Sequence, residues 1–486
     1  MTSHLSIVGF QLGLTNCSAA VFHKDKFCHI PISPNQLVLP AMVFMENINR
    51  VLVGSEARRK KLEKPKYTYY ELFRLLGEKY SHSTMEKLTQ YFPFSINGSN
   101  EMTPKNFLEK ILGKLKEVTQ DYLENEIKNV RLAVPNFFGL KQNQIIQEVC
   151  SDLQLEVDSI ISQPICAIYY YLLQNPKKGL VPVIDWGGQS IEISIFELFE
   201  DEIHFLGSTG ELFMGEYGFI ENGYEKAIQK LKSEKKVTLE HRPISQQRLL
   251  DALEAAKCQL SKISQAQIHL PFLTQGMEGS PIDFDWLWQQ SQFEKGIVPL
   301  VDQALDRLDQ VLKELDLPRS QIQDAVFMGG HMHIPYIVNR FKVYLGIPIQ
   351  SEFDSSEIAL RGLVCEEFFK MPVKRRFLPF SIGFEDYFGN FVRVFPKFSK
   401  FPCTKSLRVM TFLDNQQQIQ LPFYRGEIRK AKENSHLGNF IFSNLPGKMK
   451  GEVVIDMTFD LDARGRFRVH GREPQSGHVS KSQFQI

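Results

Sequence analysis

The sequence predicts a duplicated α/β domain followed by a small β-sandwich, and three observations support this. Two segments, 7–22 and 183–195, each have the pattern of a strand, a glycine-containing turn and a second strand. Around them, apolar strand patterns alternate with amphipathic helix patterns, which is typical of an α/β fold. From residue 377 onward, short alternating runs are separated by Gly, Pro, Asn and Asp, as in a β-sandwich. The 486 residues suffice for about three domain-sized units.

The first lobe, about 1–180, is expected to continue with strands and helices in turn. A strand-rich region reaches about residue 55 and is followed by the basic turn 58–61. The later patterns predict, in order, a helix over 68–77, an amphipathic helix over 106–127, a strand over 130–134 and a helix over 141–153.

The second lobe, about 181–370, repeats this plan after the hairpin at 183–195. Helical patterns follow over 220–230, 246–263 and 297–315. An apolar strand over 325–328 then ends at Gly329 and Gly330, so this glycine pair lies between a buried strand and a helix.

A basic linker, 371–376, leads to the predicted sandwich over 377–486. Its strands are expected at 377–384, 408–413, 419–423, 438–442, 453–461 and 466–469. We expect no helical segment after them.

Composition narrows the class of protein. The 57 basic and 56 acidic residues balance, so no strong field would attract nucleic acid or an anionic membrane. Seven scattered cysteines form no CxxC pair, which indicates free thiols in a reducing compartment. No apolar stretch is long enough to cross a bilayer, and the first ten residues show no signal-peptide pattern. A soluble cytoplasmic protein is expected.

The hairpin at 183–195 carries the pattern of an anion site. Gly187 and Gly188 have no Cβ, so backbone amides in this turn can approach a phosphate. Asp185, at the end of the first strand, is placed to hold a hydrated Mg²⁺ against that phosphate. An ordinary hairpin with a glycine turn would show the same local pattern. The second copy at 7–22 and the glycine pair at 329–330 favour the anion site.

Together these three segments resemble the two phosphate loops and the adenosine loop of the actin-like, ribonuclease-H-like duplicated ATPases. More narrowly, the chain resembles the seventy-kilodalton heat-shock (DnaK-like) chaperone family. The likeness extends into the predicted sandwich through 378–383, 424–427 and 459–462, and so covers nearly the whole chain.

This resemblance implies a site for ATP or ADP and Mg²⁺. Asp185 and Ser190 match catalytic positions of the family. The implied nucleotide-binding residues are Gly13, Leu14, Thr15, Asn16, Gly187, Gly188, Gln189, Glu254, Lys257, Ser261, Gly329 and Gly330. The spacing of Glu254, Lys257 and Ser261 places them on one helix face, which without the resemblance would fit a solvated surface equally well.

Several charged groups of the family are missing at the matching positions. Gln11, Phe73 and Gln163 stand where the family has Asp, Lys and Glu, and Asn143 stands for an arginine. Losing a general base or a water-positioning group alone costs ~10²–10⁴ in rate. The sequence therefore predicts weak nucleotide binding with little or no ATP hydrolysis.

The adenosine loop and its surroundings differ too. His331 and His333 replace the family's serine and arginine, and Ser356 replaces a nearby aspartate. With no third ligand in view, a metal site made by the two histidines is disfavoured.

The resemblance also assigns peptide-contacting positions and a linker. Tyr387, Phe412 and Ile419 match the arch and central pocket of the family's peptide-binding domain, with bulkier side chains than usual. The family's acidic, leucine-rich linker is replaced by 371–376, which contains three basic residues and a proline. We expect its docking energy to be largely lost and the two domains to be uncoupled.

The sequence thus predicts a chaperone-like protein or co-chaperone that is a pseudo-ATPase without a helical lid. Its expected partners are an unfolded peptide or partner protein, with a J-domain co-chaperone or ribosome-associated complex as the nearest analogy. The alternative is a slow ATP-dependent chaperone with a working peptide-release cycle. A sugar kinase or filament protein is disfavoured because a sandwich follows the second lobe.

Overall fold

The structure is a computed structural model of the 486-residue chain. It describes residues 7–23, 26–47, 50–77, 102–174, 178–212, 214–276, 279–347, 353–365, 371–375, 377–462 and 466–485. Residues 463–465, between the strands predicted at 453–461 and 466–469, lie outside these ranges. The chain divides into two compact units. One comprises 1–194, 209–312 and 318–370, and the other comprises 195–208, 313–317 and 371–486.

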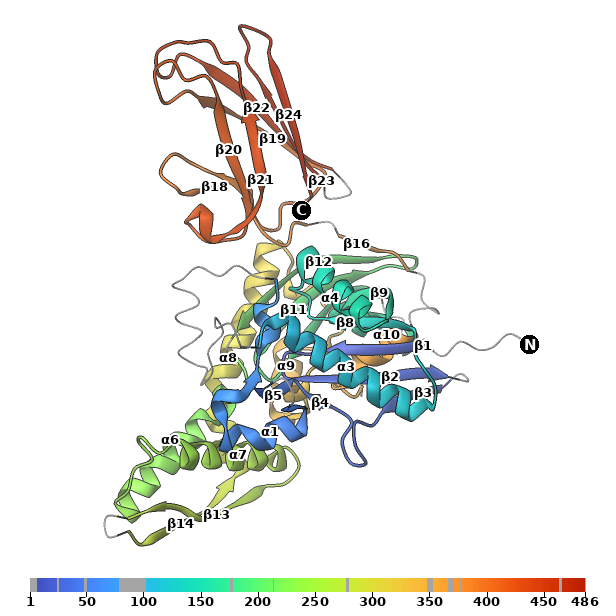
Figure 1. Ribbon diagram of the computed structural model, residues 1–486, viewed down its shortest axis with the longest axis vertical. Helices are drawn as coiled ribbons and strands as arrows, with labels where there is room; N and C mark the ends of the chain where they lie inside the picture. Colours follow the sequence, from blue (N-terminus) through green and yellow to red (C-terminus); the bar gives the residue numbers. More distant parts are fainter. Residues whose placement is uncertain are drawn as a thin grey trace, which may run out of the picture. The chain divides into compact units, whose positions relative to one another are not determined.

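A six-stranded sheet forms the centre of the first lobe (Figure 1). Its main path is β3-β2-β1-β8-β9, and β4 pairs with β2 at the side. β1 pairs antiparallel with β2 and parallel with β8. The strands are β1 (Ile7–Leu12), β2 (Asn16–His23), β3 (Lys26–Ile30), β4 (Leu39–Pro40), β8 (Asn129–Val134) and β9 (Glu156–Ser162).

A second sheet runs β15-β10-β11-β12-β16, and its four strands β12-β11-β10-β15 have the order of β3-β2-β1-β8. β1 and β10 are the first strands of their three-strand runs. Each also pairs in parallel with a later strand, β1 with β8 and β10 with β15. The strands are β10 (Gly179–Trp186), β11 (Ser190–Leu198), β12 (Ile203–Leu212), β15 (Val326–Met328) and β16 (Val373–Arg375). The repeated order supports the predicted duplication.

Helices accompany these sheets, as an α/β fold requires. They are α1 (Ser55–Glu63), α3 (Pro104–Leu123), α4 (Leu140–Asp152), α5 (Gln163–Gln174), α6 (Glu216–Lys235), α7 (Pro243–Leu260), α8 (Gln290–Glu314), α9 (Pro335–Leu345) and α10 (Ile358–Val364). α3 shows why they form: Thr103 accepts a hydrogen bond from the Asn106 amide as N-cap, and Phe107, Ile111 and Leu115 line its buried face.

Two small sheets and several short 3₁₀ turns complete the first unit. The sheets are β6-β5-β7, from β5 (Met42–Asn47), β6 (Arg50–Val53) and β7 (Thr68–Tyr70), and the hairpin of β13 (Gln265–Gln275) with β14 (Pro281–Gln289). The turns are η1 (Pro65–Tyr67), η2 (Leu72–Leu75), η3 (Arg319–Gln321) and η4 (Gly330–His333). The helix predicted over 68–77 is therefore wrong. Its first residues pair with β5 as a strand, because tertiary pairing overrides a weak helical pattern.

The C-terminal part is a sandwich of two four-stranded sheets, β18-β17-β20-β21 and β19-β22-β23-β24. The strands are β17 (Ile382–Glu385), β18 (Phe391–Phe395), β19 (Cys403–Met410), β20 (Ile419–Arg425), β21 (Ser435–Phe442), β22 (Val454–Leu461), β23 (Arg466–Arg472) and β24 (Val479–Gln485), with the 3₁₀ turn η6 (Ala431–Glu433). Burial alternates residue by residue along β22 and β23, and Phe423, Phe459 and Phe467 meet between the sheets. β24 is a strand that the sequence pattern did not predict.

The linker differs from its prediction. Val373–Arg375 forms β16 and pairs in parallel with β12, with Lys374 opposite His204. The Lys374 ammonium also makes an ion pair with Glu202. The sequence pattern did not predict this strand, and the expected loss of docking energy stays a prediction. The expectation that nucleotide does not influence the sandwich also stays a prediction.

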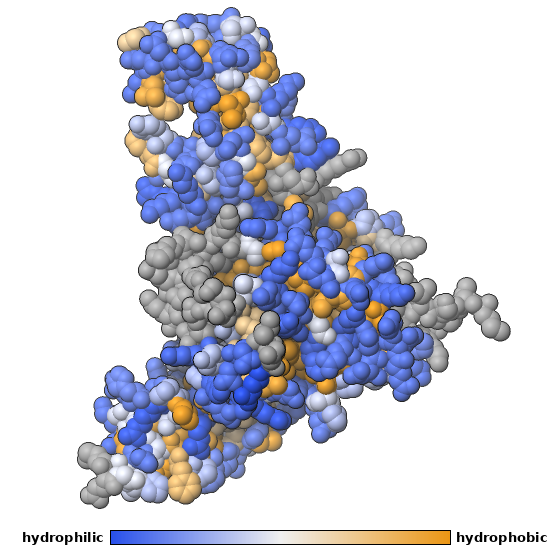
Figure 2. Space-filling view, viewed as in Figure 1, coloured by the Kyte–Doolittle hydropathy of each residue, from blue (hydrophilic) through white to orange (hydrophobic). Residues whose placement is uncertain are grey.

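The described surface is mainly polar, with apolar patches among the charged residues (Figure 2). All seven cysteines are free thiols, and burial raises the pKa of Cys17 and of Cys150 to about 12. Within the described ranges, no helix is long and apolar enough to cross a membrane.

Candidate functional site

The two predicted phosphate turns close in the same way. In the β1–β2 turn the Gly13 amide donates to the Asn16 carbonyl oxygen at 3.1 Å. In the β10–β11 turn the Gly187 amide donates to the Ser190 carbonyl oxygen at 3.0 Å. The duplication seen in the sheets thus extends to the turns.

These two turns lie against each other. A Cβ added at Gly188 would lie 2.5 Å from Thr15 Oγ1, so only glycine allows this approach. Thr15 Oγ1 and Gln11 Oε1 are buried and have no hydrogen-bond partner among the described residues. Unpaired buried oxygens are rare in proteins, and here they mark a place where a ligand or its hydration would bond.

Asp185 ends β10 and is half-buried. Burial raises the pKa of Asp185 to about 7. Its Oδ1 would lie 2.7 Å from a Cβ at Gly329, whose φ of +93° also favours glycine. The carboxylate is thus held between the second turn and the adenosine loop, where a cation would stabilise its charged form.

Oxygen atoms are the available donors for Mg²⁺ at this place. Gln11, Thr15 and Asp185 fit an ion that keeps most of its waters and is completed by phosphate oxygens. No set of three or more His, Cys, Asp and Glu side chains within the described ranges is arranged to hold a metal. Asp185 would therefore be the main protein anchor of a bound Mg²⁺.

Phe73 does not take part in the site. Its side chain is 1% exposed and packs edge-on against Phe107, with ring centroids 5.1 Å apart. The next residue, Arg74, turns instead to the second phosphate turn, where its Nη2 lies 2.7 Å from Gln189 Oε1. Arg74 also makes a 3.1 Å ion pair with Glu71.

Arg74 is thus a site residue that sequence reasoning missed. Its signal was a single charge inside the apolar run 72–76, because a buried charge normally has a specific partner.

Gln163 is buried at the start of α5 and reaches the first turn. Its Nε2 donates to the Leu12 carbonyl oxygen at 2.8 Å. A carboxylate has no proton to donate, so glutamate could make this bond only in its protonated form. The glutamine is thus an integral hydrogen-bond donor at this position. Asn143 Oδ1, on α4, is buried without a hydrogen-bond partner.

The adenosine-type loop is joined to both α7 and the second turn by His331. Its Nε2 lies 3.1 Å from Lys257 Nζ, and its Nδ1 lies 2.9 Å from the Gly187 carbonyl oxygen. Lys257 also pairs with Glu254 at 2.7 Å. Ser261 caps α7 and donates to the Lys257 carbonyl oxygen at 3.2 Å. Burial, followed by the nearby Lys257 ammonium, lowers the pKa of His331 well below its usual value.

Two residues of α6 complete this region and were not predicted. The Phe219 ring stacks on His331 with centroids 4.0 Å apart and an interplanar angle of 9°. The Glu216 amide donates to the Gly188 carbonyl oxygen at 2.6 Å. Burial and the neighbouring Glu254 carboxylate raise the pKa of Glu216 to about 7. Gly215, directly before α6, was the sequence signal for these two residues. A glycine before a helix N-terminus favours close approach of the backbone to another group.

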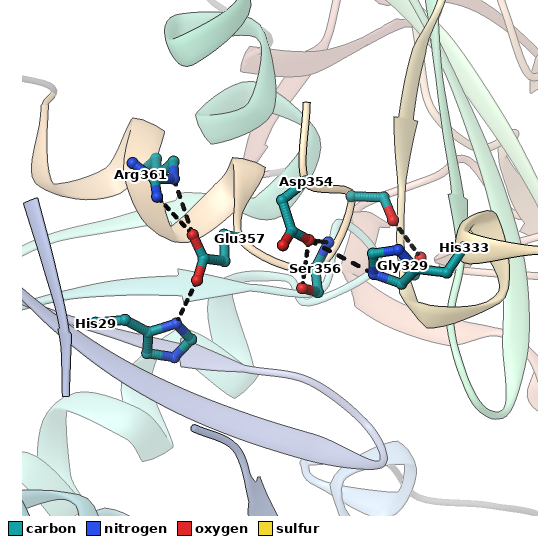
Figure 3. A network of polar contacts seen from close by, with 8 residues as sticks. His29, Gly329, His333, Asp354, Ser356, Glu357 and Arg361 are labelled. Carbon is teal, nitrogen blue, oxygen red and sulfur yellow. Dashed lines mark hydrogen bonds and ion pairs between the residues drawn. The ribbon is translucent and has the colours of Figure 1, made fainter. Parts of the chain in front are cut away.

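The loop is braced from its other side by the segment 354–361 (Figure 3). Ser355 Oγ donates to the Gly329 carbonyl oxygen at 3.1 Å, and the Ser356 hydroxyl donates to Asp354 at 2.6 Å. His333 is half-exposed and lies 3.5 Å from Asp354. In the same segment, Glu357 joins His29 of β3 to Arg361 of α10, as Figure 3 shows.

The structure brings most predicted nucleotide-site residues together. Thr15 meets Gly188, His331 joins Gly187 to Lys257, and Asp185 abuts Gly329. Leu14 is buried, Asn16 is exposed, and Gly330 faces open space. The side chain of Ser190 is half-buried at the start of β11.

The predicted peptide-contacting residues separate into two environments within the sandwich. Tyr387 and Phe412 are 70% and 39% exposed, and their rings contact each other with centroids 4.8 Å apart. Phe388, at 83% exposure, packs edge-on against Tyr387. Ile419 is 3% exposed and belongs to the sandwich core.

Comparisons with known proteins agree with this architecture. The family model described as Hsp70 protein matches residues 7–486. A relative described as chaperone protein dnaK, from Cyanidium caldarium, is 29% identical over 490 residues. That match covers 97% of this chain and 79% of the relative.

Proposed function

The chain belongs to the Hsp70 family, and from this premise we propose that it is a chaperone-like protein or co-chaperone that binds adenine nucleotide weakly and hydrolyses ATP little or not at all. Residues 1–370 would form the nucleotide-binding domain, 371–376 the linker and 377–486 the domain that binds a peptide or partner protein. A J-domain co-chaperone is the expected class of regulator. Seven free cysteines favour a reducing compartment such as the cytoplasm.

The observation that carries this proposal is the hydrogen bond from Gln163 to Leu12. A buried amide that donates to a backbone carbonyl is a positioning group without charge, and it cannot serve as a base. Phe73 adds to this, because its ring lies in the core and cannot orient a water. Two groups that would polarise or position an attacking water are thus replaced by structural ones.

Nucleotide binding itself is supported by the parts that remain. The Gly188 approach to Thr15 keeps the two turns close together, and the Arg74 guanidinium, a donor that suits phosphates, lies at the second turn. Asp185 would hold the hydrated Mg²⁺, which would neutralise phosphate charge when bound. With a single carboxylate anchor, the nucleotide affinity should depend on Mg²⁺ less than in a site with several.

Isothermal titration of the full chain with ADP and with ATP tests this proposal. We expect weak but measurable binding that changes by less than about tenfold when Mg²⁺ is removed. Lys257→Ala should weaken ADP binding, whereas Lys232→Ala, an exposed lysine on α6, serves as the matched control. Tight binding that requires Mg²⁺ would contradict the proposal.

One observation favours the alternative of a slow ATPase with a peptide-release cycle. β16 is paired with β12, and Lys374 pairs with Glu202, so the linker is held as a strand. A held linker is a physical element through which a nucleotide could act on the sandwich. Peptide affinity that changes on addition of ATP would favour this alternative.

In the sandwich, Tyr387 and Phe412 are the proposed contacts for a peptide or partner. Their exposed rings meet, so together they can cover an extended chain or bury a partner's apolar side chain. Burying a Leu-sized side chain contributes about 1.5–3 kcal/mol. Ile419 would act only through its packing in the sandwich core.

A further inference from the structure

We propose that the His331 imidazole is an internal occupant of the nucleoside end of the site, and that it must release Lys257 before a purine nucleotide binds fully. This inference rests on the proposed nucleotide-binding function and names a residue that limits the affinity.

The hydrogen bonds around His331 define its state. An ammonium can only donate, so Nε2 of His331 accepts from Lys257 at 3.1 Å. Nδ1 then carries the proton and donates to the Gly187 carbonyl oxygen at 2.9 Å. Both ring nitrogens are therefore satisfied by the protein while the imidazole is neutral.

The ring also fills an aromatic position. His331 is 5% exposed and lies nearly parallel to Phe219, 4.0 Å away between centroids. Such a flat, buried position beside one donor, Lys257, suits a heteroaromatic ring that has a nitrogen acceptor. A purine base has this chemistry, and the imidazole presents the same groups on a smaller ring.

Lys257 is the group that His331 withholds from a ligand. Its ammonium lies 2.7 Å from Glu254 and is buried among Glu254, His331 and the Phe219 ring, which lies 5.8 Å from Nζ. A ligand that needs a hydrogen bond from Lys257 must replace the one to His331. Since the existing bond is buried and well satisfied, the ligand gains less net free energy from Lys257 than it would from an ammonium not bonded to His331.

The phosphate end of the site is different, because His331 meets the second turn at the Gly187 carbonyl oxygen, an acceptor that would not bond a phosphate, whereas the cation at that turn is Arg74. A ligand made only of phosphates should therefore be insensitive to His331. Comparing ADP with a phosphate-only ligand therefore distinguishes an effect of His331 at the nucleoside end from a general effect of its substitution on folding.

Titration calorimetry with ADP and with inorganic tripolyphosphate tests the inference on the full chain. In His331→Ser the ADP affinity should increase by about tenfold or more, while the tripolyphosphate affinity stays within about twofold of the parent. The matched control is His269→Ser, an exposed histidine paired with Asp285 at 2.6 Å, which should change neither affinity.

A second measurement needs no substitution. In ¹⁵N-resolved spectra of the parent protein, saturating ADP should shift the His331 ring signals away from those of the Nδ1-protonated tautomer. Unchanged His331 signals at saturating ADP would overturn the inference even if His331→Ser failed to fold.

The titrations also separate this inference from the proposed function. If the parent binds ADP and folded His331→Ser binds no tighter, the inference fails and the proposed function stands. If only His331→Ser binds ADP, the inference is supported and weak binding by the parent is withdrawn. If neither protein binds ADP, both are overturned.

Discussion

The Gln163 amide and the Leu12 carbonyl oxygen show how one side chain decides what the site can do. The bond between them is 2.8 Å long and buried, and the donor belongs to the amide nitrogen. An ionised carboxylate at the same place would face the carbonyl with a lone pair, leaving two acceptors together.

We therefore expect Gln163→Glu to destabilise the folded protein by about 1–3 kcal/mol at pH 8, because a buried bond is lost and a charge is desolvated. The loss should diminish at acid pH, where the new carboxyl is protonated and can donate. Gln144→Glu, at an exposed position in the first turn of α4, is the control and should stay within about 0.5 kcal/mol. Denaturant unfolding at both pH values measures this, and equal stability of the two variants would refute it.

Asp185 gives a second expectation at this scale. Its folded pKa is about 7, above its ordinary value of 3.8, so the folded state holds the proton more tightly than the unfolded chain does. The contribution of Asp185 to the free energy of unfolding is thus favourable below about pH 4 and is lost as the pH rises through 7.

Asp185→Asn should accordingly stabilise the ligand-free protein at pH 8 by roughly 1–4 kcal/mol, since each pKa unit corresponds to about 1.4 kcal/mol. At pH 4 the variant and the parent should unfold alike. Glu216, whose pKa is also about 7, contributes the same trend to both proteins and cancels in the comparison. A difference that is independent of pH would show that burial of the Asp185 charge is not the cause.

Sequence reasoning located the glycine turns but not the cation beside them. Glycines can be recognised in the sequence because close approach of the backbone requires them, as at Gly188 beside Thr15. In η2, by contrast, the choice between Phe73 and Arg74 depends on which side chain the 3₁₀ turn directs into the core. Similarly, the sequence could not decide that His331 is buried and His333 half-exposed, because the short η4 turn sets both directions.

At the scale of elements, the β13–β14 hairpin contains a strained residue. Phe272 has φ of 50°, lies at a register shift between 270 and 274, and is 69% exposed. Its amide donates to Asp283 at 2.7 Å, and its carbonyl oxygen accepts from Arg248 at 2.8 Å. These bonds hold a conformation that costs a bulky L-residue about 1–2 kcal/mol.

Replacing Phe272 with Asn should stabilise the protein by up to about 1 kcal/mol, because asparagine tolerates the left-handed conformation and little buried surface is lost. Phe272→Val should instead destabilise it by about 1–2 kcal/mol, since β-branching raises the cost. The comparison of the two unfolding midpoints is the measurement. The reverse order would show that the strain is not real.

Elements with strong periodicity were predicted well, and elements made by pairing were not. α3 and α8 follow their apolar spacing. α3 lies within four residues of the predicted 106–127, whereas α8 ends one residue before the predicted 315 and begins seven residues before the predicted 297. β7 and β16 have three residues each and form only because β5 and β12 offer a partner edge. A short charged strand such as Val373–Arg375 carries no periodic signal of its own.

At the scale of the whole molecule, the order of segments was more informative than any single motif. The two sheets with the same strand order and the sandwich after them follow from the repeated hairpins and the change of pattern at residue 377. What the chain does with nucleotide depends on a few side chains in this framework.

The coupling between nucleotide and sandwich is the first expectation at this scale. We predict that saturating ATP leaves hydrogen exchange across the described sandwich residues, 377–462 and 466–485, unchanged. Coupling requires a nucleotide-dependent difference in free energy between two states, and the described contacts that hold the linker, the pairing of β16 with β12 and the ion pair of Lys374 with Glu202, involve no phosphate. ATP-dependent protection in these residues would favour the slow ATPase cycle instead.

The central claim is that this Hsp70-family chain holds ATP without cleaving it at the rate of a working ATPase. Its most direct test is single-turnover cleavage, with saturating full-length protein, Mg²⁺ and trace labelled ATP, in preparations free of other chaperones. The account predicts that bound ATP is recovered almost entirely uncleaved, and that Asp185→Asn behaves like the parent in this assay. Rapid cleavage by the parent that is abolished in Asp185→Asn would contradict it.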